Sequence, residues 1–277
     1  MRYHHKNKFR VIKASGRPET FSRRKLYQSL KRSGLPRRDC RHISEKVAHE
    51  LGEGTNTGEI FKKTLDLVKK TSPLASVNYS LKKALFDMGP EGHYFELFVA
   101  RYFEEIGYET ETCRVFQGKY VKHEVDVVGR LNGGRFFSEC KFHNRAGIKN
   151  DIKIALYVKA RWDDLKDGPE GHNLKRFIVV SNTAFSVDAM TYAKGTGLEL
   201  LGVNSPQKES FLETIKKMRL FPVTSLRSLQ RPLKRQLLDR GIVLAKDIIY
   251  HKALLTRLGL GQNEIEKIMR ELEVLEG

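Results

Sequence analysis

Three consecutive residues in the middle of the chain, Glu139, Cys140 and Lys141, carry the groups most suited to chemistry. Side chains alternate faces along a strand, so Glu139 and Lys141 point the same way, about 7 Å apart. Asp126, on the strand pattern just before, can bring a second carboxylate beside Glu139. Such a cluster is costly to bury alone, and a divalent metal and a phosphate would relieve that cost. The pattern therefore favours metal-dependent phosphodiester cleavage.

A helix is expected immediately before these strands. Residues 93–106 place aromatic and aliphatic side chains in one stripe at helical spacing, and Glu96 borders that stripe. Two interpretations of Glu96 remain open. It is either a first-turn carboxylate favoured by the helix dipole or an active-site carboxylate leaning over the edge of the sheet.

The central part of the chain predicts an α/β fold with a mixed sheet flanked by helices. A hairpin turn is expected at 132–134, and a basic helix with Lys149 and Lys153 available to phosphates is expected after the third strand. The expected strands are 112–117, 121–129, 135–142, 176–181 and 198–203, with a further helix over 187–194.

This order, together with the side chains Glu96, Asp126, Glu139 and Lys141, resembles the PD-(D/E)xK nuclease superfamily. The most similar branch is the Mrr-like, type IV restriction endonuclease domain, here over residues 89–206. A Glu-x-Lys tripeptide alone is weak evidence, and the strand context and upstream carboxylates give the match its specificity.

The resemblance implies roles for five residues. Asp126, Glu139 and the backbone carbonyl of Cys140 would hold Mg²⁺ or Mn²⁺ through oxygen atoms. Lys141 would orient the attacking water and stabilise charge, and Glu96 would support the metal site. The alternatives are an exposed surface cluster of charges or a degenerate domain that binds DNA without cutting it.

The first block, residues 1–88, shows a short β-hairpin followed by helical patterns. Three stretches of this block are distinctive: Val11–Lys13, Gly16–Glu19 and Thr57–Ile60. In them the block resembles the ATP-cone domain, which implies ATP or dATP as a regulatory ligand. A fold can outlive its site, so a docking module without nucleotide is the alternative. The nucleotide contacts implied by the resemblance are Val11, Lys13, Glu19, Lys25 and Thr57.

The last block, residues 207–277, is helical in pattern, with helices expected from Val223 onward and over 245–258. Gly259 and Gly261 lie in an apolar-Gly-apolar-Gly turn that resembles a helix-hairpin-helix, whose backbone N–H groups bind a DNA phosphate. Gly259 is explained equally well by a helix C-cap, so a plain helical or oligomerisation module is the alternative. We expect a homo-oligomer.

The composition limits the classes of partner that the protein is expected to bind. A formal net charge of +18 over 277 residues favours nucleic acid. No apolar run approaches the ~20 residues of a membrane span. Three widely spaced cysteines argue against a disulfide framework or a zinc site and favour a reducing cytoplasm.

The sequence as a whole favours a nucleotide-regulated, metal-dependent DNA endonuclease acting in defence or DNA processing. The alternative from another class is a nucleotide-sensing DNA-binding regulator without cleavage activity. No P-loop motif is present, so a motor role is not expected.

Overall fold

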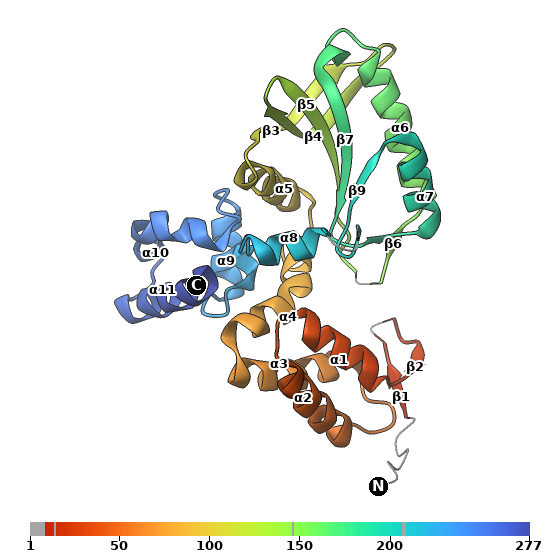
Figure 1. Ribbon diagram of the computed structural model, residues 1–277. Helices are drawn as coiled ribbons and strands as arrows, with labels where there is room; N and C mark the ends of the chain where they lie inside the picture. Colours follow the sequence, from red (N-terminus) through yellow and green to blue (C-terminus); the bar gives the residue numbers. More distant parts are fainter. Residues whose placement is uncertain (1–8, 14, 146, 207–208) are drawn as a thin grey trace. The chain divides into compact units, whose positions relative to one another are not determined.

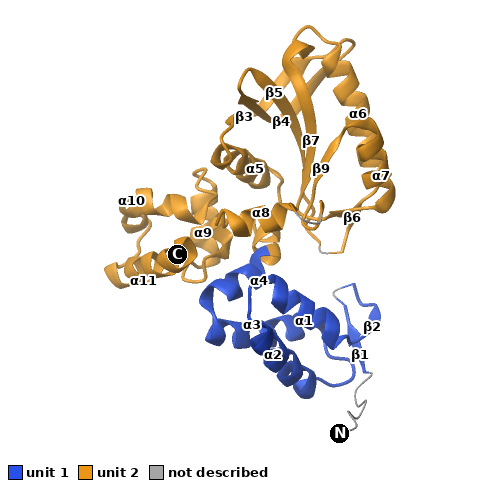
Figure 2. Cartoon of the chain, in the orientation of Figure 1, with its two compact units in different colours: residues 1–81 blue, residues 82–277 orange. Residues whose placement is uncertain are grey.

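The computed structural model describes residues 9–277 except 14, 146, 207 and 208 (Figure 1). The chain forms two compact units, residues 1–81 and 82–277 (Figure 2). The division falls inside helix α4, Pro73–Phe86, and the predicted boundary at residue 88 lies two residues beyond that helix.

The first unit is a small hairpin-and-helix body, as its sequence pattern predicts. Its elements are β1 (Arg10–Ile12), β2 (Pro18–Thr20), α1 (Arg23–Arg32), α2 (Arg37–Glu50), α3 (Thr57–Thr71) and the first part of α4. Ser22 caps α1 by accepting the N–H of Lys25, and Asn56 caps α3 by accepting the N–H of Gly58. The helices bury the apolar stripes that predicted them, including Leu30, Ile43, Val47 and Val68.

The second unit contains a five-stranded mixed sheet in the order β3-β4-β5-β7-β9. Its strands are β3 (Glu109–Gln117), β4 (Lys122–Leu131), β5 (Gly134–Lys141), β7 (Leu174–Ser181) and β9 (Glu199–Leu201). The first three form an antiparallel meander, and β7 and β9 add in parallel. The predicted mixed sheet flanked by helices is therefore confirmed.

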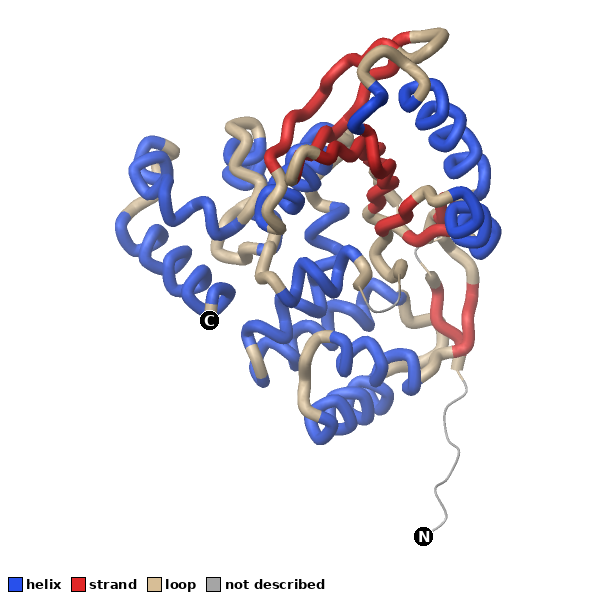
Figure 3. Tube along the Cα trace, turned by 45° about the horizontal axis from the view of Figure 1, so that its top comes forward, coloured by secondary structure: helices blue, strands red, loops and turns tan. Residues whose placement is uncertain are grey.

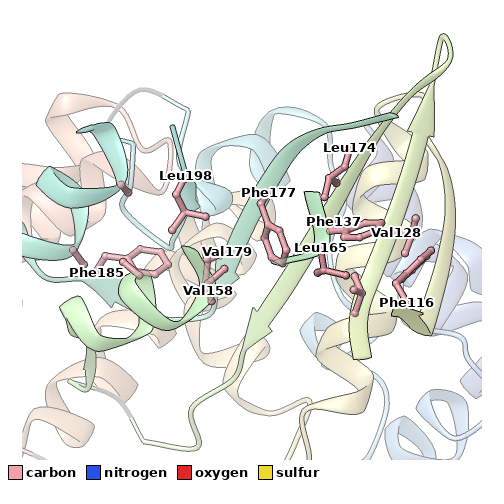
Figure 4. Close-up of a cluster of buried hydrophobic side chains, with 14 residues drawn as sticks. Phe116, Val128, Phe137, Val158, Leu165, Leu174, Phe177, Val179, Phe185 and Leu198 are labelled. Atoms are coloured by element: carbon pink, nitrogen blue, oxygen red, sulfur yellow. The ribbon is translucent and has the colours of Figure 1, made fainter. Parts of the chain in front are cut away.

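Helices cover this sheet (Figure 3). They are α5 (His93–Glu105), α6 (Ile152–Lys166) and α7 (Val187–Thr196). One buried cluster joins α6 and α7 to the strands, with Val158 and Ala189 packed among Phe137, Phe177 and Val179 (Figure 4). The cluster is apolar and closely filled, so it fixes how the helices lie on the strands.

Aromatic packing attaches α5 to the sheet. Phe136 of β5 lies opposite Gly129 of β4, and a Cβ atom at residue 129 would overlap the Phe136 ring. The same ring lies 4.4 Å, centroid to centroid, from Phe103 of α5. Glycine is thus required at residue 129 for the aromatic packing that attaches α5.

The turn between β4 and β5 explains the register of that strand pair. Asn132 and Gly133 both have positive φ, at 50° and 75°. Two successive left-handed residues make the turn that matches the natural twist of a hairpin. The hairpin predicted at 132–134 is therefore confirmed.

The basic helix starts later than its spacing predicts. Asp151 accepts the N–H of Lys153, so α6 begins at Ile152. Lys149 belongs instead to the short strand β6 (Lys149–Asn150), which pairs in parallel with β8 (Ala184–Phe185). The expectation of a helix at Lys149 is wrong, because Asp151 caps the N-terminus of α6 and the helix begins only after Lys149.

The C-terminal part is helical, in shorter pieces than expected. The α-helices are α8 (Phe211–Lys217), α9 (Arg231–Leu238), α10 (Lys252–Arg257) and α11 (Gln262–Glu276). Segments Val223–Ser225 and Ala245–His251 are 3₁₀ turns where longer α-helices are predicted. Among the described residues, no helix combines the length and apolar character needed to cross a bilayer.

Candidate functional site

Strands β4 and β5 separate at the predicted site. The backbone pairing of β4 with β5 ends at Val127 opposite Ser138, whereas β5 continues beside β7 as far as Lys141. Beyond that point, the side chain of Asp126 replaces the ladder: its Oδ2 accepts the backbone N–H of Cys140 at 2.6 Å. The opening between the strands therefore presents Asp126 beside the strand that carries Glu139.

Glu139 is buried, with 5% of its surface exposed, and each of its oxygens meets a cation. Oε1 accepts from Lys141 and Oε2 accepts from Arg161 of α6. The guanidinium also donates to the backbone carbonyl of Glu124. A buried carboxylate needs such partners, and the two cations hold the side chain of Glu139 in place.

Arg161 is absent from the set of residues that the sequence predicts for this site. It lies on α6, 22 residues after Glu139, and only 8% of its surface is exposed. Long charged side chains are rarely buried this deeply unless they are paired. The sequence does carry a signal for Arg161, because it lies among the apolar residues of a predicted helix.

Asp126 has an unusual protonation equilibrium. Burial, and next the charge of Glu139, raise its pKa from 3.8 to about 7. The N–H of Cys140 and the charge of Lys141 act in the opposite direction. The carboxylate is therefore held in a place where its negative charge is poorly compensated.

Glu96 lies in the first turn of α5, with its side chain 22% exposed. Its Oε2 accepts from the Cys113 thiol at 3.8 Å and lies 4.0 Å from His93 Nδ1. Burial raises the pKa of Glu96, and the charges of Glu124 and Glu139 raise it further. The helix position fits the dipole interpretation, and the neighbouring carboxylates show that Glu96 also borders the Asp126–Glu139 site.

A polar network holds the end of β5. Ser181 Oγ donates to the backbone carbonyl of Lys141 at 2.8 Å, and Asn150 Nδ2 donates to Ser181 Oγ at 2.9 Å. His143 Nε2 lies 2.8 Å from Asn150 Oδ1. These groups are buried or half-buried and mutually bonded, so they limit movement of the strand that carries Lys141.

Cys140 is half-buried, and desolvation raises the pKa of its thiol well above the usual value for a cysteine. A thiol in that state is a poor nucleophile. Its backbone, rather than its sulfur, is the part relevant to the site.

The predicted nucleotide contacts lie in the first unit, and three of them meet. Glu19 Oε2 lies 2.7 Å from Lys13 Nζ, and its Oε1 accepts from Lys25. These two lysines lower the pKa of Glu19 to about 2. Val11 is buried on β1, where the next residue, Ile12, bridges to Asn56 beside Thr57. The five residues therefore gather around the hairpin and the start of α3.

The other predicted DNA contacts are dispersed. Lys149 is exposed on β6, and Lys153 is exposed in the first turn of α6. Gly259 has φ +88° after α10, and Gly261 is the N-cap of α11. The N–H of Gly261 donates to Glu264 at 3.0 Å, so a carboxylate of this chain already occupies the place expected for a phosphate.

Comparison with known proteins assigns the central domain to a class. Residues 89–205 match the family model Mrr_cat, described as a restriction endonuclease, and residues 221–276 match the family described as AF1548-like, C-terminal. Together with the mixed sheet, the first match indicates a nuclease domain of the restriction endonuclease superfamily.

Relatives extend this assignment over more of the chain. An uncharacterized protein of Archaeoglobus fulgidus is 32% identical over 180 residues, 65% of this chain and 100% of that protein. This chain belongs to the family of that Archaeoglobus protein. The crystal structure of a protein of unknown function, AF1548, aligns with a TM-score of 0.56 and 31% identity, over 68% of this chain and 100% of that one.

Proposed function

We propose that residues 89–206 form a metal-dependent DNA endonuclease with Asp126, Glu139, Lys141 and Glu96 in its active site. The observation that carries the proposal is the place of Asp126, set beside Glu139 where β4 and β5 separate. Lys141 contacts Glu139 and keeps 29% of its side chain exposed, within reach of a substrate.

The charges around the opening fit a divalent cation. Glu96, Glu124, Asp126 and Glu139 supply four carboxylates, and their mutual influence on pKa shows that they are neighbours. Lys141 and Arg161 supply two positive charges. With all four carboxylates ionised, the remaining charge is about −2, which one Mg²⁺ or Mn²⁺ ion would neutralise, and carboxylate oxygens suit both ions.

The backbone of Cys140 supplies a further oxygen. An extended residue directs its N–H and its C=O to the same side of the strand. The N–H of Cys140 faces Asp126, so its carbonyl faces the same opening. Asp126, Glu139 and this carbonyl would hold the ion. A bound ion of this kind supplies Lewis-acid activation of water and of the scissile phosphate.

The remaining work belongs to side chains. Lys141 would position the attacking water by hydrogen bonding and offset the negative charge that develops on the phosphorus centre. Arg161 donates to Glu139 from α6 and so holds the carboxylate in one orientation. Glu96 would complete the metal environment from the helix side.

DNA is the expected substrate. A nuclease domain implies a nucleic acid, and the net charge of +18 would attract one. Two exposed lysines, Lys149 of β6 and Lys153 of α6, would meet phosphates. The helices of residues 207–277, with Gly259 and Gly261, would add DNA contact or hold a second copy of the chain in a homo-oligomer.

The first unit would regulate the nuclease by binding ATP or dATP, as an ATP-cone domain over residues 1–88. Supporting this, Lys13 and Lys25 converge on Glu19 beside Val11 and the start of α3. Lysine ammonium groups bind phosphates as point charges, so a nucleotide would compete with Glu19 for both of them.

Incubation of the protein with supercoiled plasmid tests the proposal. We expect Mg²⁺-dependent conversion to open-circular and linear DNA, altered by ATP or dATP, and lost with chelator or in Asp126→Ala and Lys141→Ala. DNA binding without any cleavage by wild type would favour the nucleotide-sensing regulator instead. Cleavage retained in both variants would refute the assigned active site.

A further inference from the structure

A second cluster of ligand-type side chains lies at the rim of the nuclease domain. Over residues 9–277, with 14, 146, 207 and 208 left aside, one group of His, Cys, Asp or Glu side chains has its ligand atoms within 4.8 Å of one another: His93, Glu96 and Cys113. His93 and Glu96 are three residues apart on one face of α5, and Cys113 comes from β3.

The distances suit a tetrahedral ion. Glu96 Oε2 lies 3.8 Å from Cys113 Sγ and 4.0 Å from His93 Nδ1. Ligands at the usual zinc distances are roughly 3.3 to 3.8 Å apart around a tetrahedron. Seating the ion requires the Glu96–Cys113 edge to shorten by about 0.3 Å and the Glu96–His93 edge by about 0.7 Å, with up to about 1.3 Å on the third edge. His93 and Cys113 are exposed, which leaves the fourth position to water.

The backbone at Cys113 is unusual at the same place. Its φ is +52°, and it occupies the register position opposite Asp126, between the regular pairs formed by Thr112 and Arg114. A left-handed cysteine inside a strand costs of order 1–3 kcal/mol and indicates a functional constraint. Here the consequence is visible, since the thiol contacts Glu96 of α5.

We propose that His93, Glu96 and Cys113 form a zinc site that competes with the nuclease metal for Glu96. Imidazole nitrogen and thiolate sulfur favour Zn²⁺ over Mg²⁺, which selects oxygen ligands. Zinc at this position restrains Glu96 and slows cleavage. The inhibitory part rests on the proposed nuclease function, and the binding part does not.

Binding is tested on the full chain by calorimetry with Zn²⁺, and by Co²⁺ as a spectroscopic substitute. We expect one high-affinity site with a thiolate-to-cobalt absorption band in the near ultraviolet. Cys113→Ser should abolish the band, and Cys113→Ser and His93→Gln should each weaken zinc binding by about tenfold or more. His172→Gln, an exposed histidine outside the cluster, is the matched control and should bind as wild type does.

The same titration in Asp126→Ala separates this site from the nuclease centre. Zinc binding retained there, with the cobalt band intact, supports a separate site whether or not the protein cuts DNA. Absence of the band in wild type, or zinc affinity unchanged in both ligand variants, overturns the site. In cleavage assays, zinc should slow wild type more than Cys113→Ser, and equal slowing overturns the inhibitory role.

Discussion

Replacing Asp126 with asparagine should stabilise the protein, although it removes a proposed metal ligand. Burial and the charge of Glu139 raise the pKa of Asp126 from 3.8 to about 7. Between these pH values the folded state binds more protons than the unfolded state, so stability falls as pH rises. Asparagine retains an oxygen that can accept the N–H of Cys140 and carries no charge.

The size of the effect follows from the pKa. Each pKa unit corresponds to about 1.4 kcal/mol, so a rise from 3.8 to about 7 amounts to at most about 4 kcal/mol at pH 8. At pH 5.5 the carboxyl is ionised mainly in the unfolded chain, which limits the effect to about 2 kcal/mol. Asp126 is half-buried, and solvent screening reduces both values by about half. We expect Asp126→Asn to gain about 1 kcal/mol at pH 5.5 and about 2 kcal/mol at pH 8.

Urea unfolding with chelator present measures this directly. Trp162 is the single tryptophan, and its ring centroid lies 6.4 Å from that of Phe177. Its fluorescence therefore reports on the folding of the second unit. The control is Glu109→Gln, an exposed strand carboxylate that should change stability by under about 0.5 kcal/mol. An Asp126→Asn variant no more stable than wild type at pH 8 would refute the reasoning.

Magnesium should reverse the order of stability at pH 8, so that wild type becomes more stable than Asp126→Asn. A ligand that binds the folded state at one hundred times its Kd adds about 2.7 kcal/mol. Wild type at pH 8 should gain this stability from Mg²⁺, with less gain at pH 5.5, where protons compete for Asp126. Asp126→Asn should gain little at either pH.

Three further changes test other parts of the molecule. Arg161→Met leaves the buried Glu139 with one cation and should cost about 3 kcal/mol in urea unfolding while reducing Mg²⁺-dependent cleavage. Gly129→Ala places a methyl group against the Phe136 ring and should cost about 1–3 kcal/mol by the same measurement. Lys13→Ala should weaken ATP or dATP binding in calorimetry while leaving basal cleavage, if the first unit senses nucleotide.

Each of these has its own control or contrary result. Arg161→Lys keeps a charge and should lie between wild type and Arg161→Met, because lysine cannot also reach the Glu124 carbonyl in the same fork. Gly134→Ala meets its neighbours only at ordinary distance and should be milder than Gly129→Ala. Unchanged nucleotide affinity in Lys13→Ala would remove that residue from the proposed site.

Local patterns were sufficient to predict most of the second unit. The alternation in β4 and β5, and the turn at 132–134, determine which residues of a hairpin face each other. For that reason the neighbourhood of Asp126 and Glu139 could be inferred without a structure. The two-residue strands β6 and β8 are too short to leave a periodic signal.

Other features depend on packing between distant segments. Arg161 approaches Glu139 only because α6 lies across the sheet, and spacing along the chain does not predict that contact. The positive φ of Cys113 has no sequence marker, since neither glycine nor asparagine is present. The cysteine spacing argued against a zinc site, yet the proposed ligands come from separate elements. The 3₁₀ turn at 245–251 has a period close to that of an α-helix and was predicted as one.

The pairing of Gly129 with Phe136 lets mutagenesis change the packing of the sheet without removing a proposed functional group. Phe136 lies three positions before Glu139 on β5, and Phe137, two positions before Glu139 and so on its face, packs in the buried cluster with α6 and α7. The aromatic contact with α5 and the carboxylate of Glu139 therefore share a strand but not a surface. A substitution at Gly129 can loosen the scaffold while every acid and base remains, so the contribution of positioning can be measured apart from that of the functional groups.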